Sequence, residues 1–498
     1  MNVNPITRLD YPDPDVIRVE DTYYMVSTTM HFMPGCEILQ SFDLVHWEHV
    51  TYVYETLDHT DAQQLKSGQN IYGQGMWAAS LRYHEGRFYI CFVANDTRKT
   101  YLYTSEKIDG PWKKQLIEGF YHDGSLLFDE DGRNYIVYGN DEIWITELNE
   151  DLTAPKKDGL HRLLVSDHKN PELGYEGSHI QKINGYYYIF LIHSLRDRWM
   201  RTEACFYSDS LEGEFTGGDV LCDDRGYCGQ GVAQGGIVDT PDGKWYAMLF
   251  QDSGAVGRIP ILVPVTWKDH FPVFGQNGHV PEEIEVHSTR PGYIYQPLVG
   301  SDDFCNGLLP RWQFNHDPDP RYYHLDALQG TYTITTREVC TELTQAVNTL
   351  TQRMSYPSCA AEVTVDASAL KEGDVAGLCA LQSCYAAVGI TKHHGKYEVL
   401  MLDKKEDGIL DMTEGTVVES HQMDFRLEAD FCNMKDEARC YYRVNKGDWL
   451  PIGTVHKLYF KLDHFTGCRF GLFCYAAEET GGSACFRDFK YYDVDEIS

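Results

Sequence analysis

Asp131-Gly132-Arg133-Asn134-Tyr135 is one copy of a short pattern that decides the fold of this chain. The pattern is an acidic residue or Asn, usually followed by Gly, then two residues and a Tyr that opens an apolar run. Each copy predicts a turn and then a buried strand. Successive copies lie roughly 45 to 65 residues apart, which is the length of a propeller blade of about four strands. The other copies are Glu20-Asp21-Thr22-Tyr23-Tyr24, Glu85-Gly86-Arg87-Phe88-Tyr89, Asn184-Gly185-Tyr186-Tyr187-Tyr188 and Asp242-Gly243-Lys244-Trp245-Tyr246.

Three acids occupy one register relative to this repeat. Asp13, Asp123 and Glu176 each lie eleven or twelve residues before the final Tyr of their copy. Equivalent positions of different blades converge on the axis of a radial fold, so we expect the three carboxyls in one pocket, where a glycosidase needs them. The same register holds Trp77 and Gln234, which suit sugar stacking and hydrogen bonding. Any one of the five also fits a turn or packing role, and the shared register favours the pocket.

The composition excludes several classes of partner. The 498 residues carry a formal net charge of −32, which disfavours binding to nucleic acid or to an anionic membrane. The N-terminus does not resemble a secretion signal, and no stretch of about eighteen apolar residues exists. Fifteen cysteines occur without a CxxC spacing, which predicts reduced thiols and neither disulfides nor zinc. These features predict a cytoplasmic protein, and a homo-oligomer is compatible with them.

The repeat stops near residue 290, and a second set of strand signals begins near residue 301. We therefore predict an all-β chain with a five-bladed propeller over residues 1–298 and a β-sandwich over residues 299–498. No low-complexity linker separates the two, so we expect them to pack rigidly. Clear strand signals of the second region are 330–335, 359–365 and 458–462.

In combination, several motifs resemble glycoside hydrolase family 43, the five-bladed-propeller β-xylosidases and α-L-arabinofuranosidases. Two of them depart from the family pattern at a Pro, namely Trp77-Ala78-Ala79 and Glu176-Gly177-Ser178-His179. The resemblance implies a concanavalin-like or jelly-roll-like sandwich at the C-terminal end. The other motifs are Asn4-Pro5, Tyr11-Pro12-Asp13-Pro14-Asp15, Ser27 to Gly35, Ser41-Phe42-Asp43-Leu44-Val45-His46-Trp47, Gly257-Arg258-Ile259-Pro260, Pro264-Val265-Thr266-Trp267 and Asn348 to Arg353.

The resemblance also implies a role for each acid. Asp13 corresponds to the general base that activates water, and Glu176 to the general acid that protonates the leaving oxygen. Asp123 corresponds to the residue that orients the acid and raises its pKa. Hydrolysis of a glycoside requires one protonated and one ionised carboxyl on opposite faces of the sugar, which agrees with this assignment.

The same resemblance implies the substrate contacts. Arg258 is expected to hydrogen-bond sugar hydroxyls, Phe32 and Trp77 to form platforms, and Gln234 to line the pocket. His179 is expected either to support the acid or to be a structural histidine. Many family members place a histidine near a hydrated calcium where this chain has Gln234, so a structural calcium stays open. We expect that the reaction requires no cofactor.

The leading interpretation is an inverting, exo-acting glycosidase that removes terminal α-L-arabinofuranosyl or β-D-xylosyl residues from arabinoxylan-type oligosaccharides. One alternative is a propeller-and-sandwich protein that binds carbohydrate without catalysis. Such a protein would keep the aromatic residues but would not need three acids in register. A second alternative is a related propeller enzyme that acts on fructosides and retains configuration.

Overall fold

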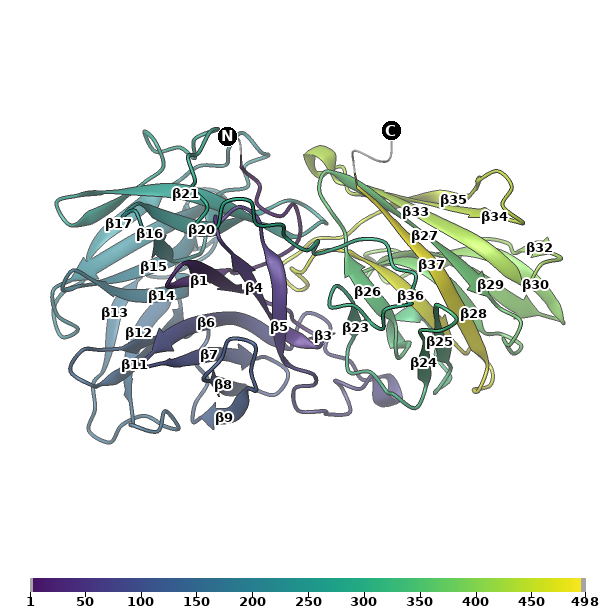
Figure 1. The fold of residues 1–498 in the computed structure, drawn as a ribbon, viewed down its shortest axis with the longest axis horizontal. Helices are drawn as coiled ribbons and strands as arrows, with labels where there is room; N and C mark the ends of the chain where they lie inside the picture. The colour runs from purple at the N-terminus through teal and green to yellow at the C-terminus, as the bar shows by residue number, and fades with distance from the viewer. Residues whose placement is uncertain (1–2, 494–498) are drawn as a thin grey trace.

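The computed structural model describes residues 3–493, which form two groups of β-strands (Figure 1). Strands β1 to β22 lie on one side of the view, and β23 to β37 lie on the other, with β3 between them. The helical elements among these residues are three short 3-10 segments. They are η1 (Lys66–Gly68), η2 (Leu343–Gln345) and η3 (Cys432–Met434).

The first group is the predicted five-bladed propeller, and the prediction of its fold is confirmed. Four blades are four-stranded antiparallel sheets, and the fifth has one additional short strand. Blades one and two comprise β1 (Asp15–Val19), β2 (Thr22–Val26), β4 (Gly35–Ser41), β5 (Glu48–Tyr54), and β6 (Met76–His84), β7 (Arg87–Ala94), β8 (Lys99–Ser105), β9 (Lys113–Ile117). Blades three and four comprise β10 (Ser125–Phe128), β11 (Asn134–Asn140), β12 (Glu142–Leu148), β13 (His161–Ser166), and β14 (Glu176–Ile183), β15 (Tyr186–Ser194), β16 (Arg201–Ser208), β17 (Thr216–Leu221). Blade five comprises β18 (Val232–Ala233), β19 (Ile237–Asp239), β20 (Trp245–Asp252), β21 (Arg258–Lys268) and β22 (Phe271–Phe274).

Each copy of the repeat forms the turn that leads into the second strand of its blade. Glu85 and Gly86 both have positive φ angles, of 47° and 78°, as does the pair Asn184 and Gly185, at 50° and 85°. Two successive left-handed residues make the tight turn whose twist matches that of an antiparallel hairpin. The Tyr that follows is buried in three copies, at Tyr135, Tyr188 and Tyr246, and half-buried at Tyr24 and Tyr89. Tyr135, for example, has no exposed surface.

The N-terminal segment closes the ring of blades by running along β21 of blade five. The side-chain amide of Asn4 donates to the carbonyl of Leu262 at 2.8 Å and accepts from its N–H at 2.8 Å. Ile6 N–H donates to the Pro260 carbonyl at 2.9 Å. The chain then enters β1, so the first and last blades are joined by backbone and side-chain hydrogen bonds. This contact explains why the Asn4-Pro5 motif stands ahead of the first repeat.

The second group is a sandwich of a nine-stranded and a seven-stranded antiparallel sheet. The larger sheet has the order β3-β23-β26-β36-β28-β29-β30-β31, with β32 also paired to β30, and the smaller has the order β24-β25-β37-β27-β33-β34-β35. The two sheets enclose a large apolar core that includes Phe425, Leu427, Phe470 and Phe486. The strands are β23 (Gln313–Asn315), β24 (Tyr323–Asp326), β25 (Thr331–Thr335), β26 (Leu350–Arg353), β27 (Ser358–Asp366), β28 (Val375–Leu381), β29 (Tyr385–His393), β30 (Lys396–Lys404), β31 (Leu410–Met412), β32 (Thr416–Val418), β33 (Gln422–Asp430), β34 (Glu437–Arg443), β35 (Leu450–Lys457), β36 (Arg469–Tyr475) and β37 (Ser483–Asp493).

The two groups of strands share structure across their junction. Strand β3 (Phe32–Met33) comes from the propeller part of the chain but pairs with β23 of the sandwich, in the register Phe314 to Met33. The sandwich core also includes Val256 and Ile259 of blade five. The last propeller strand ends at Phe274 and the first following sandwich strand begins at Gln313. The boundary near residue 298 falls between them and stays a prediction.

Two further features of the chain bear on the predictions from composition. All fifteen cysteines are free thiols, and ten of them are buried, including Cys36 and Cys379. Across residues 3–493 there is no helix of the length and apolarity that crossing a membrane requires.

Candidate active site

The five register positions meet in one pocket at the end of the propeller axis where the innermost strands begin. The pocket has a volume of about 250 Å³. A larger hollow of about 790 Å³, between the N-terminal segment and residues 295–299, holds none of the three acids. The residues that line the smaller pocket are Asp13, Trp77, His122, Asp123, Asn140, Leu173, Glu176, Gln234, Arg258, Leu462 and Phe465.

Asp13 is held rigidly on one side of this pocket. Its backbone is left-handed, with a φ of 53°, between Pro12 and Pro14, and its side chain is 3% exposed. The Thr28 hydroxyl donates to Asp13 Oδ2 at 2.5 Å, and the Arg258 guanidinium donates to Oδ1 at 2.7 Å. A left-handed non-glycine residue is costly and persists where the surrounding structure fixes it. Both carboxylate oxygens are therefore oriented before a ligand arrives.

Asp123 and Glu176 form the other acidic side of the pocket. Asp123 also has a left-handed backbone, with a φ of 48°, and its Oδ2 accepts a hydrogen bond from the N–H of Gly177 at 2.9 Å. Asp123 thus fixes the residue next to Glu176, as its predicted orienting role requires. Glu176 is the first residue of β14, and the Asn140 amide donates to its Oε2 at 2.8 Å.

The surroundings of Asp123 and Glu176 shift the pKa values of the two carboxyls in opposite directions. Burial, together with the carboxylates of Glu176 and Asp13, raises the pKa of Asp123 to about 6. Burial also favours a raised pKa at Glu176, but the hydrogen bond and positive charge of His122, with Arg201 and Arg258, outweigh it and lower that pKa. The predicted role of Asp123, to raise the pKa of Glu176 by like-charge repulsion, stays a prediction, and the nearby cations act against it.

His122 is the cation between the two carboxyls. Its Nε2 lies 3.5 Å from Asp123 Oδ2 and 3.5 Å from Glu176 Oε2. Burial disfavours the charged imidazole, but the negative charges of Asp123, Glu176 and Asp13 overcome this and raise the pKa of His122 to about 9. No role was predicted for His122 from the sequence, although its position next to Asp123 was an available signal.

Three of the predicted substrate contacts line the pocket. Gln234 has a left-handed backbone with a φ of 63°, like Asp13 and Asp123. The Trp77 ring closes one side, and its buried Nε1 has no hydrogen-bond partner among the described residues. Arg258 is engaged by Asp13 and also donates to Asp252 Oδ1 at 3.2 Å. In this structure Arg258 is therefore hydrogen-bonded to an acid of the pocket.

Phe32 and His179 were both proposed for the substrate site, and neither is among the residues that line the pocket. Phe32 belongs to β3, is 2% exposed, and has the Arg469 guanidinium 3.5 Å from its ring centre, so its face is covered by the sandwich. His179 Nδ1 lies 3.1 Å from Asp15 Oδ1. Side chains alternate in direction along a strand, but a bulge between Glu176 and His179 shifts the register here. His179 is the structural histidine of the two roles considered.

The sandwich supplies one wall of the pocket through Leu462 and Phe465. The Phe465 ring stands edge-on to Trp77, with ring centres 5.3 Å apart, and the Arg258 guanidinium lies 4.0 Å from its centre. Asp10 holds this segment against the propeller, because its two oxygens accept from Gly467 N–H at 2.7 Å and Arg258 N–H at 2.8 Å. Sequence reasoning missed this wall because no repeat connects residue 465 to the blades.

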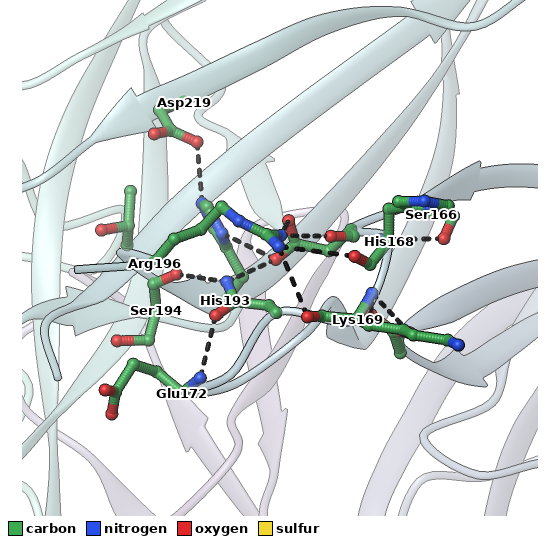
Figure 2. A network of polar contacts seen from close by, with 12 residues as sticks. Ser166, His168, Lys169, Glu172, His193, Ser194, Arg196 and Asp219 are labelled. Atoms are coloured by element: carbon green, nitrogen blue, oxygen red, sulfur yellow. Dashed lines mark hydrogen bonds and ion pairs between the residues drawn. The ribbon is translucent and has the colours of Figure 1, made fainter. Parts of the chain in front are cut away.

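The loop between β13 and β14 brings Leu173 to the pocket and ends at Glu176. A polar network holds this loop (Figure 2), in which His193 joins Asp219 at 2.8 Å and Asp167 at 3.2 Å. Burial opposes the charged form of His193, but these two carboxylates raise its pKa. Arg196 also donates to the Asp167 carbonyl at 2.6 Å, so the loop is tied to β15 at several points.

The surroundings of Gln234 bear on the calcium that the resemblance left open. Its backbone N–H donates to Glu203 Oε2 at 2.7 Å, and Glu203 Oε1 is buried without a hydrogen-bond partner among the described residues. Burial raises the pKa of Glu203 well above its ordinary value. Calcium requires several ionised or carbonyl oxygens around one point. One buried carboxyl whose pKa is raised and one amide do not supply such a set of oxygens at Gln234, and the structural calcium stays a prediction.

Comparison with known proteins agrees with this architecture in both parts of the chain. The model of glycosyl hydrolases family 43 matches residues 3–272, and that of the beta xylosidase C-terminal concanavalin A-like domain matches residues 301–492. A beta-xylosidase of Formosa agariphila is 26% identical over 99% of this chain and 89% of its own length. A non-reducing end alpha-L-arabinofuranosidase of Bacteroides ovatus is 24% identical over 82% of this chain and 79% of its own.

A solved structure extends the comparison to three dimensions. The bifunctional GH43-CE protein of Bacteroides eggerthii is 42% identical, with a TM-score of 0.92 over 99% of this chain. The present chain spans 63% of the length of that protein. The family match covers more than half of the sequence, and the pocket holds acids from three blades. The chain therefore belongs to glycosyl hydrolases family 43 and is a glycoside hydrolase.

Proposed function

We propose that this chain is an inverting, exo-acting glycosidase that removes terminal α-L-arabinofuranosyl or β-D-xylosyl residues from arabinoxylan-type oligosaccharides. The observation that carries the proposal is the small pocket in which Asp13 faces the pair Asp123 and Glu176. Its volume of about 250 Å³ is below the ~300–1,000 Å³ of sites for larger ligands, which suits one terminal sugar. The relatives named as a xylosidase and an arabinofuranosidase support this choice of sugars.

In the proposed reaction, Asp13 takes a proton from water while Glu176 gives a proton to the leaving oxygen. Arg258 and Thr28 hydrogen-bond Asp13, which orients its oxygens. Asp13 enters from blade one and Glu176 from blade four, so a water has room on the face of the sugar opposite the acid. Inverting enzymes place the two carboxyls ~6.5–9.5 Å apart for this reason, whereas a retaining pair is about 5 Å apart.

Exo action follows from the closed side of the pocket. Trp77 and Phe465 stand edge-on to each other on one side of the pocket, and we expect them to stop a polysaccharide from passing through it. One end of a glycan can enter such a pocket, and the reaction then releases a monosaccharide.

A panel of p-nitrophenyl glycosides tests the activity and the choice of sugar together. We expect turnover of the α-L-arabinofuranoside or the β-D-xyloside, and Asp13→Ala and Glu176→Ala are each expected to lower kcat by several orders of magnitude. Thermal unfolding of the variants controls for loss of fold. A variant that keeps more than about a tenth of the wild-type kcat, a loss under ~1.4 kcal/mol, would show that its residue does not have the assigned role.

The anomeric outcome is tested separately. Proton NMR during hydrolysis of a short arabinoxylo-oligosaccharide should first show a monosaccharide of inverted configuration. A retained anomer would rule out Asp13 as the base for water and would favour the fructosidase-like alternative. Internal fragments that precede monosaccharide would contradict exo action.

A further inference from the structure

Arg201 is a buried cation whose guanidinium is only partly hydrogen-bonded. It is the first residue of β16 in blade four and is 1% exposed. Its Nε donates to Asp252 Oδ2 at 2.7 Å, but its Nη1 and Nη2 are buried and have no hydrogen-bond partner among the described residues. Burial of an arginine with unsatisfied N–H groups costs free energy, so its persistence here calls for an explanation.

The carboxylate that binds Arg201 also binds a residue of the pocket. Asp252 is the last residue of β20 and is 2% exposed. While its Oδ2 accepts from Arg201, its Oδ1 accepts from Arg258 Nε at 3.2 Å. Arg258 faces Asp252 in the register of β20 and β21, whereas Arg201 comes from the neighbouring blade. One carboxylate thus joins two arginines from two blades.

The contacts continue from Arg258 to the proposed base. Arg258 Nη1 donates to Asp13 Oδ1 at 2.7 Å. Arg201, Asp252, Arg258 and Asp13 therefore form a row of alternating charge, in which each residue is 5% exposed or less. Because charges interact strongly where water is excluded, a change at one end of the row affects the other end.

Aromatic rings hold the two guanidiniums in place. The centre of the Phe250 ring lies 5.3 Å from Cζ of Arg201 and 4.6 Å from Cζ of Arg258. The Trp199 ring centre lies 5.1 Å from Cζ of Arg201. A ring attracts a cation over its face but does not fix which way the N–H groups point in the plane of the guanidinium. The carboxylates therefore decide that direction.

Arg201 limits how Asp252 can bind Arg258. With Oδ2 engaged by Arg201, Asp252 holds Arg258 through Oδ1. A carboxylate with both oxygens free favours two parallel hydrogen bonds to one guanidinium. Without Arg201, two carboxylates would share one cation, and Asp252 would compete with Asp13 for the N–H groups of Arg258. We expect Arg258 to turn away from Asp13 in that case.

We propose that Arg201 is a positioning residue for the base, which acts through Asp252 to keep Arg258 turned toward Asp13; the inference rests on the proposed function. Arg201 contacts neither sugar nor water in this role. It keeps the Asp13 carboxylate in the orientation in which it takes a proton from water. A misplacement of about 1 Å at a reacting group can lower the rate by about 100-fold, so a residue outside the pocket can control kcat.

A double variant separates this role from a purely structural one. Arg201→Met removes the charge and the hydrogen bond, and kcat should fall by about 10-fold to 100-fold. Addition of Asp252→Asn removes the carboxylate that captures Arg258, so the double variant should recover most of that loss. A structural role predicts no recovery, because the double variant loses one more contact. A folded double variant that is no more active than Arg201→Met would overturn the proposal. If Arg201→Met alone does not fold, a folded double variant more than about 100-fold below the wild type would overturn it.

The leaving group shows at which carboxyl the effect arises. A defect at the base slows hydrolysis of every glycoside, whereas a defect at the acid spares a substrate with a good leaving group. Arg201→Met should therefore lose activity by a similar factor on a dinitrophenyl glycoside and on an unactivated disaccharide. A loss confined to the disaccharide would place the effect at Glu176 and would overturn the proposal.

Arg162→Met is the matched control. Arg162 also joins two blades, because it lies in β13 and donates to the carbonyls of Leu211 and Gly213 at 3.1 and 2.9 Å, but it does not line the pocket or contact the row. Its kcat should stay within about threefold of the wild type, even if its melting temperature falls. A loss as large as that of Arg201→Met would show general damage to the propeller and would overturn the proposal.

A crystal structure of Arg201→Met tests the inference without catalysis. Arg258 should bind both oxygens of Asp252 and lie beyond hydrogen-bond distance of Asp13. An Arg258 that still donates to Asp13 would overturn the inference, even in an enzyme of low activity. If Arg258 has turned but the wild-type protein cleaves no glycoside, the proposed function fails while the control of Arg258 by Arg201 stands.

Discussion

The wall that the sandwich contributes to the pocket can be tested by removing one ring. In Phe465→Ala the edge-on contact with Trp77 and the stacking over Arg258 are both lost. Both partners line the pocket, so their positions relative to the sugar depend on this ring. Phe465 itself is 4% exposed, which makes the change a core truncation as well.

The size of the effect follows from these contacts. An aromatic pair contributes ~0.5–1.5 kcal/mol beyond burial, and a desolvated cation–π contact contributes about 0.5–2 kcal/mol. Their sum of about 1–3.5 kcal/mol corresponds to a fall in kcat/KM of about fivefold to 400-fold. Truncation of a buried Phe also lowers the free energy of unfolding by ~3–5 kcal/mol.

The assay is kcat/KM on the p-nitrophenyl substrate that the wild type cleaves, beside thermal unfolding of each variant. Phe465→Leu keeps most of the volume without the ring, so it should recover stability but not the full activity. Leu462→Ala is the control, since Leu462 lines the same pocket but is 50% exposed, and we expect a change within about threefold. A Phe465→Ala enzyme that is folded and within about threefold of the wild type would refute the reasoning.

Three further predictions follow from the site and the domain junction. Asp123→Asn should lower the alkaline limb of the pH–rate profile, because the carboxylate of Asp123 opposes ionisation of Glu176 by like-charge repulsion; an unchanged limb with normal kcat would indicate a turn residue. A chain ending at residue 298 should be insoluble or inactive, since it lacks Phe465 and the Gly467 contact to Asp10; full activity in soluble form would contradict this. His193→Gln should lower the melting temperature most below pH ~6.5, because a pKa raised on folding gives stability that is lost as pH rises through it, and a deficit that does not vary with pH would disprove the charged pairing.

The sequence by itself determined the propeller and its register. The repeat is local, because each turn and the strand after it are encoded within a few residues. A constant spacing from the repeat therefore places equivalent residues of different blades at the same height along the propeller axis. For this reason Asp13, Trp77, Asp123, Glu176 and Gln234 could all be placed in one pocket from spacing alone, and the structure brings all five to it.

The family motifs predicted less well where contacts run between distant segments. Phe32 follows the first repeat closely, but β3 pairs with β23, some 280 residues away in the chain, and the ring is covered by Arg469. His179 lies three residues after Glu176 in the same motif, yet a bulge in β14 separates the two and His179 contacts Asp15. Neither outcome has a signal within the motif itself.

Only the tertiary structure decided how the pocket is closed and charged. Phe465 reaches Trp77 because Asp10 binds both Gly467 and Arg258, a contact between three segments that share no repeat. The pKa of Glu176 depends on His122 and on the buried arginines, whose influence falls with distance in space and not with separation in sequence. Spacing along the chain fixes which side chains share a level of the propeller, whereas packing between the two domains fixes what faces them.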